Sequence, residues 1–375
     1  MKSWALVFLM FAVTSVASSA GLDCVSCHAD KASSKDSAHA GLSCSGCHEG
    51  IQSFPHPEKA TPVNCATCHT ASAAALGNSV HASAGGPACL NCHGDAHSIL
   101  RANNPRATTY PTNLPHTCGV CHGDAKAAKR VGLQEVYSLY MDSIHGFSLT
   151  RDGLLVAANC SSCHGSHSIL SSKNPQSKTN RANIAATCGT CHVGPLQAFS
   201  SSIHGQKLQA GSTTAPACTS CHTAHQISKV GTAEWQMKTT ATCGGCHQDQ
   251  FATYHDTFHA QVSSLGYQAT ARCWDCHGYH DIRPASDPKS MIAPAQLTTT
   301  CGKCHAGANA SFVKYDPHAN SHDRAQYPAL HYSAVFMNLL LAGALGFFAL
   351  HTILWFLRLR FGPNTDAGPT PSLPK

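Results

Sequence analysis

The sequence has few charged residues and few aromatic side chains. Of 375 residues, 25 are Lys or Arg and 19 are Asp or Glu, so charged residues make up 12%, about half the share usual in a soluble domain. This low charge excludes a disordered acidic or basic tail, and no heptad repeat indicates a coiled coil. Aromatic residues amount to only 7%. We therefore expect something other than side chains to fill the interior.

Cysteine and histidine are abundant instead, with 22 Cys and 27 His. The cysteines form eleven C-x-x-C pairs, and each pair is followed at once by His. This is the attachment signal of c-type haem, in which two thiols on one helical turn reach the vinyl groups of one porphyrin and the next residue supplies the proximal imidazole. The pattern predicts eleven covalently bound haem c groups. The motifs are Cys24/Cys27/His28, Cys44/Cys47/His48, Cys65/Cys68/His69, Cys89/Cys92/His93, Cys118/Cys121/His122, Cys160/Cys163/His164, Cys188/Cys191/His192, Cys218/Cys221/His222, Cys243/Cys246/His247, Cys273/Cys276/His277 and Cys301/Cys304/His305.

Zinc sites and disulfides also use closely spaced cysteines, but neither requires His directly after the second Cys. Because His follows all eleven pairs, haem is the favoured interpretation. About 28 residues are available for each motif, too few to insulate one haem from the next. We expect the haems to form the core in near contact. The predicted fold is mainly irregular with short α-helices and little or no β-structure.

Eleven further histidines form two groups that predict the second axial ligands. Six stand in short signatures such as Ser143-Ile144-His145-Gly146, 11 to 13 residues after a proximal His except for one gap of 23. About twelve residues make three helical turns, roughly 18 Å, so each should return over the far face of the preceding haem. The others lie three to eight residues past a proximal His and should reach a neighbouring haem. The signature group is His39, His81, His145, His204, His259 and His318, and the follow-on group is His56, His97, His167, His225 and His280.

The match of eleven further histidines to eleven motifs predicts bis-histidine ligation throughout, although a surface or propionate-bonding role stays open for any single one. His255 and His322 are alternatives to His259 and His318. The motifs are organised as one single-haem lead-in followed by five two-haem repeats. Three connections within these repeats align, at residues 99–105, 169–175 and 282–288.

Both ends of the chain carry apolar segments. Residues 1–20 have the charged start, short apolar stretch and small-residue end of a signal peptide, with an uncleaved anchor as the alternative. Residues 329–357 are expected to form a transmembrane helix rather than a buried core helix, because no charged residue occurs between Arg324 and Arg358. Arg358 and Arg360 then place the tail, 358–375, in the cytoplasm. The haem domain, 21–328, should lie in the periplasm at the bacterial inner membrane.

The formal charge of +6 counts the amino-acid side chains only and leaves the cofactors out. Loss of the signal peptide and the two propionates of each haem make the holoprotein acidic. We therefore expect no nucleic-acid partner.

The repeated C-x-x-C-H motifs, their Cys-His-Gly-x-x-His follow-ons and the Thr-Cys-Gly-x-Cys-His forms resemble the multihaem cytochrome c family, of the cytochrome c3 and doubled C-x-x-C-H type. The resemblance covers residues 24 to about 320. The ending, with Leu330-His331-Tyr332 and His351, resembles cytochromes that work beside a membrane cytochrome b. That resemblance implies quinone-linked electron transfer, with any cytochrome b as a separate subunit.

The leading hypothesis for function is an electron carrier, not an enzyme. It would relay electrons between a quinone-linked membrane partner and periplasmic or outer-membrane acceptors. One alternative is a multihaem reductase of nitrite, hydroxylamine or a sulfur oxyanion, which needs an iron with an open site. Another is a subunit that only docks or anchors a larger complex. His331 and His351 either contact a partner or anchor the helix at the two interfaces.

Overall fold

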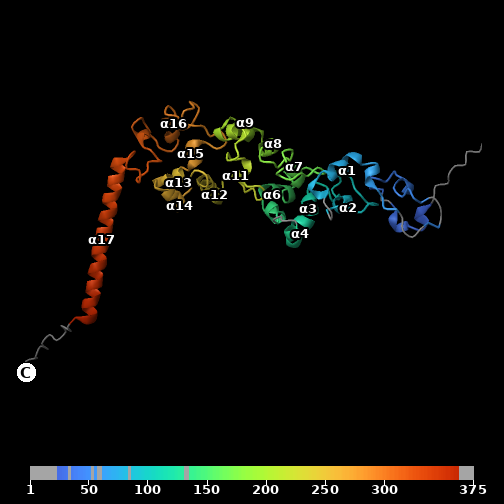
Figure 1. The fold of residues 1–375 in the computed structure, drawn as a ribbon, viewed down its shortest axis with the longest axis horizontal. Coiled ribbons are helices and arrows are strands. Elements are labelled where there is room, and N and C mark those ends of the chain that lie inside the picture. Colours follow the sequence, from blue (N-terminus) through green and yellow to red (C-terminus); the bar gives the residue numbers. More distant parts are fainter. Residues whose placement is uncertain are drawn as a thin grey trace, which may run out of the picture. The chain divides into compact units, whose positions relative to one another are not determined.

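The computed structural model describes residues 23–32, 35–51, 55–56, 61–82, 86–130 and 135–362. Within these ranges there are sixteen short α-helices, one long C-terminal α-helix, six 3₁₀ helices and no strand. Figure 1 shows the short helices joined by irregular connections. The predicted fold class is therefore confirmed. The predicted signal peptide lies outside the described residues.

The elements follow one another in chain order. The first half contains η1 (Cys24–Ser26), η2 (Ala29–Lys31), η3 (Cys44–Gly46), η4 (Cys65–Thr67), α1 (Thr70–Gly77), η5 (Val80–Ala82), α2 (Cys89–His93), α3 (Leu114–His122), α4 (Ala125–Arg130), α5 (Tyr137–Met141), α6 (Ile144–Thr150), α7 (Cys160–His164) and α8 (Ile184–Gly189). The second half contains α9 (Val193–Ser201), α10 (Ile203–Gln209), α11 (Cys218–His222), α12 (Ala233–Gly244), α13 (Gln248–His255), α14 (Phe258–Ser264), α15 (Cys273–His277), α16 (Leu297–Gly302), η6 (Phe312–Lys314) and α17 (Pro328–Phe361).

The chain divides into two compact units. Unit 1 comprises residues 1–200 and 204–229, and unit 2 comprises residues 201–203 and 230–375. The motifs up to that at Cys218 belong to unit 1. The motifs at Cys243, Cys273 and Cys301 belong to unit 2.

Four of the motifs are complete five-residue helices: α2, α7, α11 and α15. Each begins at its first Cys, after a residue with extended backbone, and ends at its His. The next residue has a positive φ, which turns the chain sharply away from the helix: Gly94 at 83°, Gly165 at 82°, Gly278 at 83° and Thr223 at 63°. Glycine adopts this conformation without strain, so the Cys-His-Gly sequence has a local structural cause.

Thr223 holds the same left-handed conformation with a β-branched side chain, which costs about 1–2 kcal/mol. Its hydroxyl donates a hydrogen bond to the Gln226 carbonyl oxygen at 2.7 Å, which offsets that strain. We expect Thr223→Gly to be nearly neutral, because it removes the strain and the bond together. Thr223→Val loses the bond as well but keeps the strain, so it should be less stable than the glycine variant by about 1–2 kcal/mol. Denaturant unfolding of both holoproteins measures the difference, and equal stabilities would contradict it.

The glycine of the Thr-Cys-Gly forms makes room for the following helix. A Cβ at Gly119 would clash with the Tyr137 ring, and one at Gly244 would clash with the Phe251 ring. The Tyr137 ring belongs to α5, the second helix after α3, and the Phe251 ring belongs to α13, which directly follows α12. Close approach of these helices therefore requires glycine after the first thiol.

The polypeptide alone buries little apolar surface. Among the described residues, the buried apolar side chains larger than alanine are Pro115, Leu149, Leu208, Tyr254 and Trp274. The accessible surface of the chain is 27458 Å², whereas a compact protein of 39.4 kDa exposes about 14,000 Å². The side chains by themselves therefore do not form an ordinary core.

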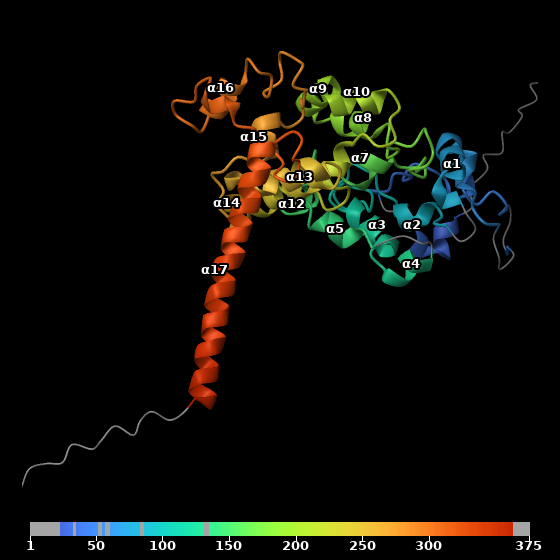
Figure 2. The same cartoon turned by 60° about the vertical axis from the view of Figure 1, so that its left-hand side comes forward.

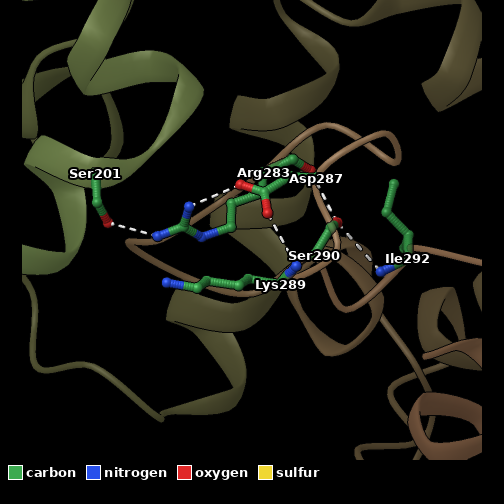
Figure 3. A network of polar contacts seen from close by, with 6 residues as sticks. All are labelled: Ser201, Arg283, Asp287, Lys289, Ser290 and Ile292. Carbon is green, nitrogen blue, oxygen red and sulfur yellow. Dashed lines mark hydrogen bonds and ion pairs between the residues drawn. The ribbon is translucent and has the colours of Figure 1, made fainter. Parts of the chain in front are cut away.

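A polar network fixes one irregular connection in unit 2 (Figure 3). The Arg283 guanidinium donates to the Asp287 carboxylate at 2.8 Å and to the Ser201 hydroxyl at 3.0 Å. The Lys289 backbone N–H also donates to Asp287, at 2.9 Å, and together with Arg283 it lowers the pKa of that carboxyl. Buried Ser290 donates to the Arg283 carbonyl at 3.1 Å. These bonds hold the 283–292 segment in place without a hydrophobic core.

The C-terminal helix α17 is one uninterrupted element, visible in Figure 2. Its 34 residues start one residue before the predicted segment and extend beyond it to include Arg358 and Arg360. Among the described residues it is the one helix long and apolar enough to cross a membrane, and its most apolar stretch has no share buried against the rest of the protein. It is compatible with a membrane anchor.

Candidate haem-binding sites

Histidine side chains from distant parts of the sequence face each other in pairs. Nine pairs have ring centroids 5.9–6.3 Å apart, and each joins the His of one motif to a His of the signature or follow-on group. In unit 1 they are His28–His56, His69–His39, His48–His97, His122–His81, His93–His167, His192–His145 and His164–His225. In unit 2 they are His305–His259 and His277–His318.

This spacing is too wide for ring stacking and matches two imidazoles on opposite sides of one metal ion. A metal–imidazole nitrogen bond is about 2.0 Å long, and that nitrogen lies about 1.1 Å from its ring centroid. Two rings on a common axis are therefore about 6.2 Å apart, within the observed range. The residues present fit an iron held between two histidines. Within the described residues, no group of three or more His, Cys, Asp or Glu is placed to hold a bare metal ion, as a zinc site requires.

The signature histidines face other partners than the expected ones. His39, for example, faces His69 at 5.9 Å rather than His28, and His318 faces His277 at 6.2 Å rather than His305. His81, His145 and His259 likewise face His122, His192 and His305, each the His of a later motif. The prediction that a signature His returns over the preceding haem was therefore wrong for these five. For His81 and His259, a helix, α1 or α13, starts directly after the proximal His and carries the chain away from it.

Four follow-on histidines, His56, His97, His167 and His225, lie as the sequence suggested, opposite the His of another motif. His97 faces His48, and His225 faces His164 with the two rings nearly parallel, at 3°. Because His39, His81, His145 and His259 face the His of a later motif, whereas the paired follow-on histidines and His318 face the His of an earlier one, the repeats interlock. The role of His204 and His280 as second axial ligands stays a prediction, and so do the second ligands opposite His222 and His247. Each of these four residues has further contacts.

In five of the six signatures a Ser or Thr stands two residues before the His and positions it. Ser143, which is 1% exposed, accepts a hydrogen bond from the Gly146 N–H at 3.0 Å and caps α6. Thr257 caps α14 in the same way by accepting from the Ala260 N–H at 3.2 Å. A capping hydroxyl fixes the start of a short helix, and His145 is the second residue of α6. The Ser-x-His spacing is therefore a helix start that aims the imidazole.

A backbone hydrogen bond ties each of four signature segments to a follow-on segment. The residue just before the signature His donates its N–H to an isoleucine carbonyl two positions after a follow-on His. The bonds are Ala38 to Ile99 at 2.7 Å, Val80 to Ile169 at 2.8 Å, Ile144 to Ile227 at 2.8 Å and Ile203 to Ile282 at 2.9 Å. Three of these isoleucines stand in the connections that align in the sequence. The fourth, Ile227, lies in a connection without that alignment, so only the structure reveals its role.

Ile144→Pro is expected to remove the bond to Ile227 selectively. Residue 144 is the first of α6, where proline is well tolerated, and Ser143 before it is already extended, with ψ 160°. Ile144→Ala is the matched control, because it removes the side chain and keeps the N–H. The proline variant should be less stable than the alanine variant by about 1 kcal/mol. Denaturant unfolding followed by haem absorbance measures this, and equal stability would show that the bond contributes nothing.

The motif thiols also meet in chain order. In each unit the first thiol of one motif lies beside the first thiol of the next. These contacts are Cys24–Cys44, Cys65–Cys89, Cys118–Cys160, Cys188–Cys218 and Cys243–Cys273. The second thiol of one motif also interacts electrostatically with the first thiol of the following motif. These interactions are Cys47–Cys65, Cys92–Cys118, Cys163–Cys188 and Cys276–Cys301. Successive attachment points are therefore neighbours within each unit.

The second thiols of eight motifs are exposed on the polypeptide. They are Cys27, Cys47, Cys68, Cys121, Cys191, Cys221, Cys246 and Cys304. The first thiols Cys44, Cys65 and Cys89 are exposed as well. An exposed thiol can react with a vinyl group, so haem attachment through these cysteines stays a prediction.

Local geometry explains this exposure in the Thr-Cys-Gly forms. In α3, Gly119 approaches the Tyr137 ring of α5. Cys121 stands two residues after Gly119 in the same helix. Two residues turn a helix by about 200°, so this thiol points away from the helix that packs against the glycine. Cys121 still interacts electrostatically with Cys92, as Cys191 does with Cys163 and Cys304 with Cys276. These three exposed thiols therefore remain close to the preceding motif.

Burial adjusts the protonation of the paired histidines. Burial lowers the pKa of His164 and His277, and the facing imidazoles of His225 and His318 lower it further. A lowered pKa keeps the ring neutral, which is the form that binds a metal.

The remaining histidines have other partners. His116 is hydrogen-bonded to the Tyr137 hydroxyl at 2.6 Å, and His255 packs edge-on against Phe251, with centroids 4.5 Å apart. His351 stacks on Phe347 within α17. In the pairs above, His259 and His318 occupy the positions for which His255 and His322 were alternatives.

These features define a haem-binding, electron-transferring protein, and two family models agree with them. The model of cytochrome c7 and related cytochrome c matches residues 9–70, and the model of the doubled CXXCH motif matches residues 211–252. No curated protein and no solved structure matches the chain.

Both matches support a multihaem cytochrome c. The chain binds haem c covalently through its C-x-x-C-H motifs, and its domains serve electron transfer.

Proposed function

We propose that the protein is an undecahaem cytochrome, anchored by α17 in the inner membrane with its haem domain in the periplasm. It relays electrons between a quinone-linked membrane partner, such as a separate cytochrome b subunit, and periplasmic or outer-membrane acceptors. The observation that carries the proposal is the set of nine histidine pairs at iron-spanning separation. Each haem, when bound, supplies a one-electron oxidation and reduction.

In this proposal the chain's own residues hold, space and tune the cofactors. Two thiols and the following His of each motif fix one haem, and a second His closes the other axial position. Ligation by two histidines keeps the reduction potential low relative to Met and His together. The two filled axial positions also leave no open iron for the reductase chemistry considered above.

The contacts between successive motif thiols support a continuous path within each unit. Because Cys118 contacts Cys160 and Cys163 interacts with Cys188, three consecutive attachment points lie side by side. Attachment points this close favour haems that are neighbours in space. The order of the motifs in the sequence would then be the order of the haems along the path.

The membrane orientation is proposed from the charges at the end of α17. Arg358 and Arg360 stand in its last turn, and cationic residues favour the cytoplasmic side. The haem domain at the other end of the helix would then face the periplasm, where covalent haem attachment takes place in bacteria.

Haem analysis of the purified holoprotein tests the proposal. We expect eleven covalently bound haems per chain and ferric spectra that are low-spin throughout. We also expect the reduced protein to be inert towards nitrite and hydroxylamine and to be reoxidised by a soluble multihaem cytochrome. Fewer haems, high-spin iron or turnover of nitrite would contradict it, and the last two would favour a reductase.

A further inference from the structure

We propose that the cavity at the outer end of α17 binds the headgroup of a membrane hydroquinone, and that this chain therefore oxidises the quinol itself. The inference deepens the proposed function, on which it rests. The cavity has a volume of about 690 Å³, within the range of small-molecule sites. It lies between the α13–α14 junction, residues 315–322 and the first turns of α17, all within unit 2.

The cavity has no described residue of a haem-attachment motif in its wall, neither a Cys nor a His. It adjoins one predicted axial ligand, because Pro317 and Ala319 on either side of His318 contribute to its wall. Thr253, also in the wall, is hydrogen-bonded to His318 Nδ1 at 3.1 Å. A ligand in the cavity would therefore lie beside the iron site formed by His318 and His277.

His331 presents a hydrogen-bond acceptor to the cavity. Its Nδ1–H donates to the Ser321 carbonyl oxygen at 2.9 Å. A carbonyl can only accept, so Nδ1 carries the proton in the neutral ring and Nε2 keeps its lone pair. The exposed carboxylate of Asp256 lines the same cavity from the α13–α14 junction. The site thus combines two groups that accept hydrogen bonds and protons.

The remaining wall identifies the class of ligand. Leu330, Ala334 and Val335 contribute apolar surface from α17, the helix that is compatible with a membrane span. An apolar tail can follow this surface into the lipid. A lipid phosphate is disfavoured by two carboxylates, Asp256 and Asp316, whereas the two hydroxyl groups of a hydroquinone can donate to such acceptors. An amphiphile that gives up protons beside a redox centre is a hydroquinone.

The reaction balances without a further co-reactant. Oxidation of one hydroquinone to the quinone breaks two O–H bonds and releases two protons and two electrons. Bound haems, held by residues such as His277 and His318, would supply the one-electron acceptors for these two electrons. Asp256 and His331 Nε2 accept the protons and release them to water on the outer side.

The test uses the full-length holoprotein in lipid nanodiscs, without a partner subunit. A decyl-substituted benzohydroquinone is the donor, and haem reduction is followed by stopped-flow absorbance. Ala334→Phe fills the cavity and should slow reduction at least about tenfold. Ala344→Phe lies on the same helix outside the cavity wall and is the matched control, with an expected rate equal to that of the wild type. Asp256→Asn, an exchange at an exposed position, should also slow reduction about tenfold.

A reduced viologen dye, which needs no site, should reduce all four proteins at the same rate. The cavity proposal is overturned if the hydroquinone reduces Ala334→Phe and Asp256→Asn as fast as the wild type, or leaves the wild type oxidised. In that event rapid reduction by the dye and transfer onward to a soluble cytochrome would still uphold the proposed function. Failure of that onward transfer would instead overturn the electron relay.

Discussion

The double substitution Cys160→Ala, Cys163→Ala is expected to unfold much of unit 1. Both thiols and His164 are half-buried, and the motif contacts Cys118 on one side and Cys188 on the other. Few buried apolar side chains could compensate, because Pro115, Leu149 and Leu208 are the ones larger than alanine in the described part of this unit. We expect a loss of more than about 4 kcal/mol, a size typical of a lost structural cofactor. Limited proteolysis and far-ultraviolet circular dichroism measure it.

The matched control is the double substitution Cys24→Ala, Cys27→Ala. Cys27 and His28 are exposed, and Cys24 contacts the motif thiol of only one neighbour, Cys44. This variant should lose one haem and local order, while the rest of unit 1 resists protease as in the wild type. If both double variants are equally stable, side chains hold the unit together and the haems are not its core.

His259→Ala is expected to leave one iron five-coordinate and high-spin. His259 faces His305 with ring centroids 5.9 Å apart, so its loss removes one of two axial ligands from that site. Electron paramagnetic resonance of the ferric protein should show a high-spin signal equivalent to one haem. The potential of this haem should rise within the range of roughly 0.8 V that axial ligands control.

His255→Ala is the control for this experiment. His255 lies four residues earlier, at the end of α13, and packs against Phe251. This variant should keep a wholly low-spin spectrum. A high-spin signal from His255→Ala together with a low-spin spectrum from His259→Ala would assign the ligand to His255 and contradict the pairing with His305.

Short-range features were predictable from the sequence because local chemistry causes them. The C-x-x-C-H spacing is a property of one helical turn, and Cys-His-Gly marks a left-handed backbone that glycine adopts without strain. The long uncharged segment near the end is recognisable because a membrane span needs about 20 apolar residues. Scarcity of aromatic and large apolar residues likewise indicated that the polypeptide by itself would not form the core.

Pairing of the histidines was not predictable in the same way. The sequence identified both groups of second ligands, yet a count cannot say which imidazole faces which. That depends on where α1 and α13 direct the chain, and on backbone bonds such as Ile144 to Ile227 that join segments 83 positions apart. Backbone donors and acceptors are identical in every residue, so such bonds leave no signal in the side chains.

The sequence by itself determined the haem attachment points, the class of fold and the two sets of candidate ligands, because each follows from contacts within a few residues. Only the tertiary structure decided the histidine pairs, the neighbours and exposure of each motif thiol and the cavity beside α17. These features depend on segments that are tens of residues apart in the sequence. The directions of the helices and the long-range backbone hydrogen bonds, rather than residue spacing, determine which of these segments come into contact.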